Sequence, residues 1–184
     1  MTVRAPHVLL CALVCAGACG DPGEPEPTHW LEGSLLQVMD LGYDEARIRF
    51  AAEDVSLTFV RLKTLRAVPA TDGGEPQEAG TTEEYPLVVA YRFVGEGRAP
   101  AGNQDLDLTA VDDTGRQRGV VSRNVSNDPR NVFPGLVRGR LVFHDALQPQ
   151  STVTGSFHVT FENGVEVASG RTVFTNAWSA LVQP

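Results

Sequence analysis

Cysteine is nearly absent from this chain of 184 residues, and its three cysteines, Cys11, Cys15 and Cys19, all lie close to the start. Residues 20–184 therefore cannot form an internal disulfide, and zinc sites built on cysteine are excluded there. A domain of this size buries enough of its unfolded surface to fold without covalent bridges. We expect its stability to come from a packed apolar core.

Basic residues are also scarce. The chain carries 15 basic and 23 acidic residues, a formal net charge of −8, and Lys63 is its only lysine. Such an acidic surface disfavours the phosphate backbone of nucleic acids and the headgroups of anionic lipids as partners. We therefore predict no nucleic-acid partner.

No apolar run is long enough to span a bilayer, which needs about 20 apolar residues. The run at residues 8–15 is short, follows the basic Arg4 and precedes the small residues 16–18. This arrangement is typical of a secretion signal. We predict a signal peptide over residues 1–18, cleaved between Ala18 and Cys19. Ala16 and Ala18 also form an A-x-A pair. The alternative is therefore cleavage of the same bond by ordinary signal peptidase, which would leave Cys19 without lipid and release a secreted protein.

The four residues Ala16-Gly17-Ala18-Cys19 resemble the lipobox of bacterial lipoproteins. The resemblance implies lipid on Cys19 and firm attachment to a membrane outside the cytoplasm. In that family an Asp directly after the cysteine can hold a protein at the inner membrane, and this chain has Gly20 there. The resemblance thus favours the outer membrane, with a freely secreted or periplasmic protein as the alternative.

Two further stretches, 33–44 and 155–164, resemble uncharacterised lipoproteins of GC-rich soil bacteria such as myxobacteria. That resemblance implies no particular function. Residues 19–28 follow the predicted cleavage site and contain Pro22, Pro25 and Pro27, which favour an extended backbone. We expect them to tether a single β-domain, residues 29–184, to its lipid.

From Trp30 onward, apolar and polar residues alternate with the period of two that is typical of β-strands. The alternation is clear in four stretches, namely 46–50, 55–59, 106–110 and 137–143. We predict an all-β fold of about nine strands, most simply an antiparallel two-sheet sandwich, with a small closed barrel as the alternative.

Three local features carry more detailed expectations. Residues 87–91 are apolar without alternation, which predicts a central strand covered on both faces. Asn163-Gly164 predicts a hairpin that pairs Phe161 with Val165. Residues 31–39 carry Leu31, Leu35 and Met39 at helical spacing, but Gly33 and the nearby β-branched residues argue against a helix. Residues 34–39, followed by a turn at 41–44, predict a first hairpin instead.

Residues 67–84 are rich in Pro, Gly and acids and contain few other signals. Glu83 and Glu84 stand there among further acids without a neighbouring base. This composition predicts a mobile acidic loop.

The sequence contains no G-x-S-x-G elbow, phosphate-binding loop or H-E-x-x-H helix. Asp113-Thr114-Gly115 matches the short core of the aspartic protease motif, but only one copy is present. We predict a turn there, with Gly115 at positive φ.

The remaining residues that could bind a metal ion are expected to be solvated side chains. His29, His144 and His158 have no second ligand at metal spacing. Asp105 and Asp107 lie on one strand face without a calcium loop around them. We predict no metal, no cofactor and no catalytic residues.

The sequence thus predicts a membrane-anchored envelope lipoprotein whose β-domain is not an enzyme but binds an unknown envelope protein or helps an assembly. The first alternative is a module that binds a glycan or a small apolar ligand. A hydrolase with catalytic residues scattered along the chain is the third hypothesis.

Overall fold

The computed structural model describes residues 25–37, 39–65, 80–93, 102–128, 133–162 and 171–184. The signal peptide, Cys19 and the Asn163-Gly164 turn lie outside these residues. The elements in chain order are β1 (His29–Trp30), the 3₁₀ turn η1 (Ser34–Gln37), β2 (Gly42–Tyr43), β3 (Glu45–Phe50), β4 (Asp54–Leu65), β5 (Gly80–Arg92), β6 (Gln104–Asp107), β7 (Gly119–Asn124), β8 (Leu136–Phe143), β9 (Thr152–Phe161) and β10 (Arg171–Val182).

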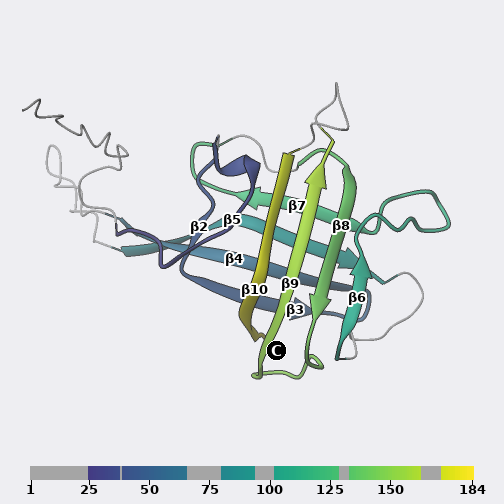
Figure 1. Cartoon of the computed structure of the whole chain (residues 1–184). Coiled ribbons are helices and arrows are strands. Elements are labelled where there is room, and N and C mark those ends of the chain that lie inside the picture. The colour runs from purple at the N-terminus through teal and green to yellow at the C-terminus, as the bar shows by residue number, and fades with distance from the viewer. Residues whose placement is uncertain (1–24, 38, 66–79, 94–101, 129–132, 163–170) are drawn as a thin grey trace, which may run out of the picture.

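Eight of these strands form one sheet in the order β6-β8-β9-β10-β3-β4-β5-β7, and β1 pairs with β2 separately. In Figure 1, β8, β9 and β10 lie in front of β3, β4, β5 and β7 and run across them. The halves join where the end of β10 turns alongside β3, pairing Leu181 with Arg47 and Val182 with Ile48 in parallel. All other pairs within the eight-stranded sheet are antiparallel.

Residues after β6 bring the two outer ends of the sheet together. The Leu108 amide donates to the Gly139 carbonyl of β8, and the Leu108 carbonyl accepts from the Gly119 amide of β7. The side-chain amide of Gln117 adds a second link, since it donates to the Leu136 carbonyl (2.8 Å) and accepts from the Leu136 amide (3.1 Å). The sheet is thereby nearly closed into a barrel.

The core lies between the two halves and is filled by the alternate residues of the strands. Val55, Leu57 and Phe59 of β4 are fully buried. Phe59 packs against Phe157 of β9, with ring centroids 5.5 Å apart, and so joins the front and back layers. The predicted all-β fold is confirmed. The two layers that were expected to be separate sheets are the two halves of a single curled sheet.

Bulges place several residues differently from a simple alternation. In β8 the register shifts between Leu136 and Arg138, so Leu136 occupies the core in place of the expected Val137. In β5 the register shifts near Pro86, which has no N–H to contribute to the ladder. β5 is covered on one face only, because Val88 and Ala90 lie half-buried on the outside.

The predicted pairing of Phe161 with Val165 is wrong. Phe161 pairs with Leu136 on one side and with Arg171 on the other, so both of its strand edges are occupied. The pairing with β10 buries Val173, Trp178 and Val182 in the core.

The expected hairpin over residues 34–39 is also absent, and η1 takes its place. Leu31 and Leu35 lie on one side of this turn and are 0% and 2% exposed. The Met39 amide donates to the Leu35 carbonyl, a helical hydrogen bond. The helical spacing of these residues was the better guide, because it matches the face that covers the core.

The domain begins earlier than the predicted boundary at residue 29. Pro27 is buried, and Thr28 donates to the Asp44 carboxylate from both its amide (3.1 Å) and its hydroxyl (3.2 Å). These two residues belong to the folded domain and not to the tether.

The predicted acidic loop ends earlier than residue 84, because residues 80–84 are part of β5. Glu83 pairs with Arg47 of β3, and Glu84 pairs with Lys63 of β4. Neither base is near these acids in sequence, so the charge compensation became visible only once the strands were aligned. Residues 66–79 lie outside the described part of the chain.

Candidate functional site

A hollow of about 270 Å³ lies on the outer face of the sheet, over β3, β4 and β5. It exists because the outward residues of three adjacent strands differ in length. Long side chains stand on β3 and on the bulged part of β5, and short ones stand on β4 between them. Its lining consists of Arg47, Arg49, Ser56, Thr58, Val60, Tyr85, Val88 and Gln183.

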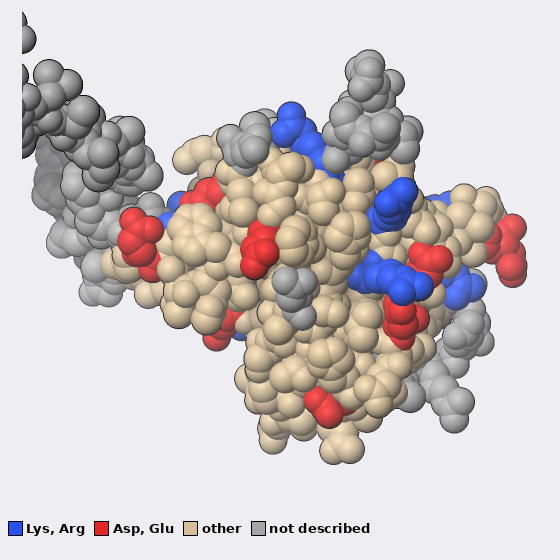
Figure 2. Space-filling model, in the orientation of Figure 1, with Lys and Arg blue, Asp and Glu red and all other residues tan. Residues whose placement is uncertain are grey.

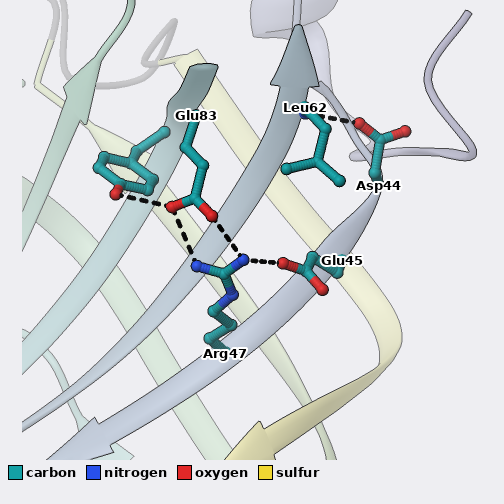
Figure 3. A network of polar contacts seen from close by, with 6 residues as sticks. Asp44, Glu45, Arg47, Leu62 and Glu83 are labelled. Atoms are coloured by element: carbon teal, nitrogen blue, oxygen red, sulfur yellow. Dashed lines mark hydrogen bonds and ion pairs between the residues drawn. The ribbon is translucent and has the colours of Figure 1, made fainter. Parts of the chain in front are cut away.

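Arg47 forms one end of the hollow and is held by two carboxylates. Its Nη1 and Nη2 donate to the two oxygens of Glu83 at 3.0 and 2.7 Å, and Nη2 also contacts Glu45. Figure 3 shows Arg47 lying between Glu45 of its own strand and Glu83 of β5. The Tyr85 hydroxyl donates to Glu83 (3.1 Å) and completes this wall. A paired Arg–carboxylate contact of this kind fixes the guanidinium plane.

These contacts also fix the protonation states at the wall. The hydrogen bond from Arg47 lowers the pKa of Glu83. The hydrogen bond to Glu83 raises the pKa of Tyr85 above its usual value. At neutral pH the carboxylate is therefore charged and the phenol keeps its proton. Neither group has the pKa near 7 that proton transfer at neutral pH favours.

Arg49, two residues further along β3, lies on the same outward face and is exposed. Within the described part of the chain it has no ion pair or side-chain hydrogen bond. Ser56 and Thr58 stand opposite Arg49 and Arg47 on β4 and line the same hollow. The hollow therefore offers one uncommitted cation beside polar groups that both donate and accept.

The floor and the far end of the hollow complete its geometry. Val60 lies on the outward face of β4, outside the core cluster, yet is 0% exposed. Val88 adds a second apolar side chain. Gln183 follows β10. Its backbone amide donates to the Ile48 carbonyl of β3 (2.7 Å), and this bond holds Gln183 beside the hollow. The curled sheet alone brings this C-terminal residue to β3.

A second hollow, of about 260 Å³, lies on the outer face of β8, β9 and β10. Its lining includes His158 and Phe174, whose ring centroids are 6.3 Å apart. Arg140 at its rim is paired with Asp105 at 3.2 Å. Because its cation is already engaged by a carboxylate, this hollow is the weaker candidate for a ligand site.

A buried polar group at the ends of β4, β5 and β7 has a structural role. Glu84 is 3% exposed, accepts from the Ser126 amide (3.0 Å) and pairs with Lys63 (3.1 Å). Burial alone would raise the pKa of Glu84, but the hydrogen bonds from Ser126 and Lys63 lower it overall. The nearly buried Arg123 pairs with Asp128 at 3.5 Å. These contacts tie the end of the β4–β5 hairpin to the segment after β7.

The Asp113-Thr114-Gly115 segment is a surface turn. Gly115 has φ +77°, as predicted, and its amide donates to the Asp112 carbonyl. The Asp112 carboxylate accepts from the Thr114 hydroxyl (2.6 Å) and from the amides of Thr114 and Arg116. Asp113 itself is exposed. The segment closes the link between residues 111 and 117 in the manner of an Asx turn.

The histidine and aspartate candidates stand apart. His29, His144 and His158 are exposed on three different segments, as expected. Asp105 pairs with Arg140, and Asp107 accepts from the amide and hydroxyl of Thr109. Among the described residues, no three His, Cys, Asp or Glu side chains come together where a metal ion would be held.

On the face of the molecule formed by β8, β9 and β10 (Figure 2), the described charged residues do not gather into a large patch of one sign. Figure 2 shows the face formed by β8, β9 and β10, where acidic and basic residues stand in small separate groups among uncharged ones. The ion pairs of this sheet follow the same pattern, with one base set beside one or two acids. Recognition at such a surface depends on direct contact and not on a long-range field.

No family model, curated protein or solved structure matches this chain. Within the described residues, no helix has the length and apolar character needed to cross a bilayer. Ala18 and Cys19 lie outside those residues, so lipidation of Cys19 and cleavage before it stay predictions from the sequence.

Sequence reasoning did not find the β3–β5 hollow. A signal was present, because Arg47 and Arg49 alternate with apolar residues on one predicted strand while Ser56 and Thr58 do so on the next. Adjacent strands joined by a short turn place such residues on one face. The sequence contained no comparable signal for Tyr85 or Gln183. A bulge in β5 places Tyr85 at the hollow, and the parallel pairing of β10 with β3 places Gln183 there.

Proposed function

We propose that this chain is a lipid-anchored protein of the bacterial envelope whose β-domain binds a ligand through the β3–β5 hollow and does not catalyse a reaction. The anchor rests on the lipobox resemblance at Cys19. The observation that carries the binding role is the guanidinium of Arg49 beside the hydroxyl-bearing Ser56 and Thr58, three side chains that form no hydrogen bond or ion pair with any other described residue.

The chemistry of the hollow supports binding over catalysis. Arg47 is locked by carboxylates, and the pKa values of Glu83 and Tyr85 are shifted away from neutrality. A site of this kind is organised for recognition before any ligand arrives, and preorganisation reduces the cost of binding.

Among the ligand classes expected from the sequence, a small apolar molecule fits least well. The space between the sheet halves is filled by packed rings, including Phe59 against Phe157 and Phe143 against Trp178. Six of the eight residues that line the hollow carry a polar or charged group, although carbon atoms form most of its surface. A glycan, which presents both hydroxyls and C–H faces, suits this mixed lining better than a wholly apolar molecule.

A photoreactive amino acid at Ser56, introduced into the lipid-anchored protein in whole cells, tests the proposal. The matched control carries the same group in place of Arg138, an exposed residue on β8. We expect a discrete envelope component to be captured from position 56 and not from position 138. Equal capture from both positions, or capture of a protein across a wide surface including both, would contradict a site at the hollow.

A further inference from the structure

The two arginines of the hollow differ in what they can bind. Arg47 is already saturated by Glu83 and Glu45, whereas Arg49 has no acidic partner among the described residues. Arg guanidinium groups bind carboxylates through two parallel hydrogen bonds. The hollow thus has a place for one carboxylate, at Arg49.

The other polar groups suit a ligand rich in hydroxyls. Ser56 and Thr58 each present a hydroxyl that donates and accepts, and the Gln183 side chain has an amide that does both. A sugar hydroxyl needs the same two roles from its partners. The half-buried Val88 supplies an apolar surface on which the C–H face of a ring can rest, with the fully buried Val60 beneath it.

We infer that the ligand of this hollow is an acidic sugar residue, a single ring with several hydroxyls and one carboxylate bound at Arg49. The inference rests on the proposed function and names the chemical class that the same site recognises. A volume of about 270 Å³ lies just below the range of pockets that hold drug-sized ligands, which suits a unit of one or two rings.

An acidic peptide fits the same position less well. β3 and β4 are each paired on both sides, so a peptide cannot add a strand there and its backbone groups would find no ladder. Glu45 and Glu83 border the hollow and would repel an extended acidic segment. A single carboxylate at Arg49 avoids that repulsion.

Amide shifts in a ¹H–¹⁵N NMR titration of the folded protein with glucuronate test the inference. From the size of the ligand we expect a Kd on the order of 1 mM. The amides of Ser56, Thr58 and Gln183 should shift. Glucose, which has no carboxylate, should bind about ten-fold more weakly, because it cannot form the charged hydrogen bonds to Arg49.

Three variants locate the carboxylate. Arg49→Gln should weaken glucuronate binding at least about ten-fold, and Arg49→Lys should weaken it less, because it keeps the charge but not the fork. Arg138→Gln, which removes another exposed arginine, on β8, should leave binding unchanged. If Arg49→Gln and Arg138→Gln weakened glucuronate binding equally, the weakening would come from the change in net charge, and the inference would be overturned.

Two further probes separate the sources of the negative charge. Glucuronate should bind more tightly than N-acetylglutamate amide and than inorganic phosphate. If N-acetylglutamate amide binds as well at the same residues, the ligand is an acidic peptide. If inorganic phosphate binds as tightly as glucuronate at the same residues, the site recognises negative charge alone. Either result overturns the sugar assignment. Capture from position 56 without a glucuronate shift would leave the binding role standing and reject only this inference.

Discussion

Gly155, within β9, lies where neighbouring groups leave no room for a side chain. A Cβ atom there would stand 2.0 Å from the Val142 carbonyl oxygen and 2.3 Å from the Trp178 ring. The backbone oxygen belongs to the paired strand β8 and cannot move aside without breaking the ladder. The cost of a side chain at this position is therefore steric.

We expect Gly155→Ala to lower the free energy of unfolding by about 3 kcal/mol or more, because overpacking forces strands apart. Gly115→Ala is the matched control. It meets open space, and its cost of about 1 kcal/mol comes from the left-handed backbone alone. Chemical denaturation measures both values. A Gly155→Ala variant no less stable than Gly115→Ala would contradict the packing described for β9.

Glu84 connects the stability of the domain to pH. Its folded-state pKa is lowered, so its contribution is complete above the unfolded value of about 4.3 and is lost as the pH falls through the folded value. We expect Glu84→Gln to lower the free energy of unfolding by about 2 kcal/mol at pH 7, the range for a charged hydrogen bond.

The difference between wild type and Glu84→Gln should begin to shrink as the pH falls below the unfolded value of about 4.3, because the unfolded carboxyl then takes up a proton before the folded one does. Urea denaturation at pH 7 and at pH 3.5 measures this change. Glu53→Gln removes an exposed carboxylate and should change stability by no more than about 0.5 kcal/mol. If Glu84→Gln lowered the free energy of unfolding equally at both pH values, the charge of Glu84 would not be the cause of the stabilisation.

Closure of the sheet depends on Gln117, whose side-chain amide pairs with the backbone of Leu136 as a strand residue would. We expect Gln117→Ala to lower the free energy of unfolding by about 2 kcal/mol, because two hydrogen bonds are lost. Hydrogen exchange at the Leu136 amide should become at least about ten-fold faster.

Gln148→Ala, at an exposed loop position, is the control for this change and should leave exchange at Leu136 unaltered. If Gln117→Ala also left it unaltered, the link through Leu108 alone would hold β7 and β8 together.

At the level of elements, the alternation of apolar residues identified most strands but not their partners. β3 and β4 could be predicted because a short turn joins them and their apolar positions coincide. The pairing of β9 with β10 could not, since several registers bury a similar number of apolar residues locally. Only packing against the opposite layer, as with Phe59 on Phe157, distinguishes them.

At the level of the whole molecule, the anchor and the domain should separate cleanly. If Cys19 carries lipid, Cys19→Ser should move the protein from the membrane fraction to the soluble fraction without changing the thermal unfolding of the domain. Mass spectrometry of the mature wild-type N-terminus should show an acylated cysteine. An unmodified Cys19 would indicate plain secretion.

The candidate site shows the same division as the fold. Arg49, Ser56 and Thr58 could have been placed together from sequence, because they lie on adjacent strands of one predicted hairpin. The ion pair between Arg47 and Glu83 could not have been predicted from the sequence. Because of this pair, Arg49 is the arginine of the hollow that stays available to a ligand. The pair needs β5 beside β4 and a long β4–β5 arm that reaches residues 80–84.

The sequence by itself determined the all-β class, the inward and outward faces of most strands, the turn at Gly115 and the prediction of an anchor at Cys19. These follow from local physics, namely side-chain periodicity, turn geometry and the apolar length of a segment. The tertiary structure alone decided the single curled sheet, the start of the domain at Pro27, the pairing of Glu83 and Glu84, and the hollow beside Gln183. Each of these depends on contacts between residues far apart in the chain, whose free energy exists only once the two layers pack.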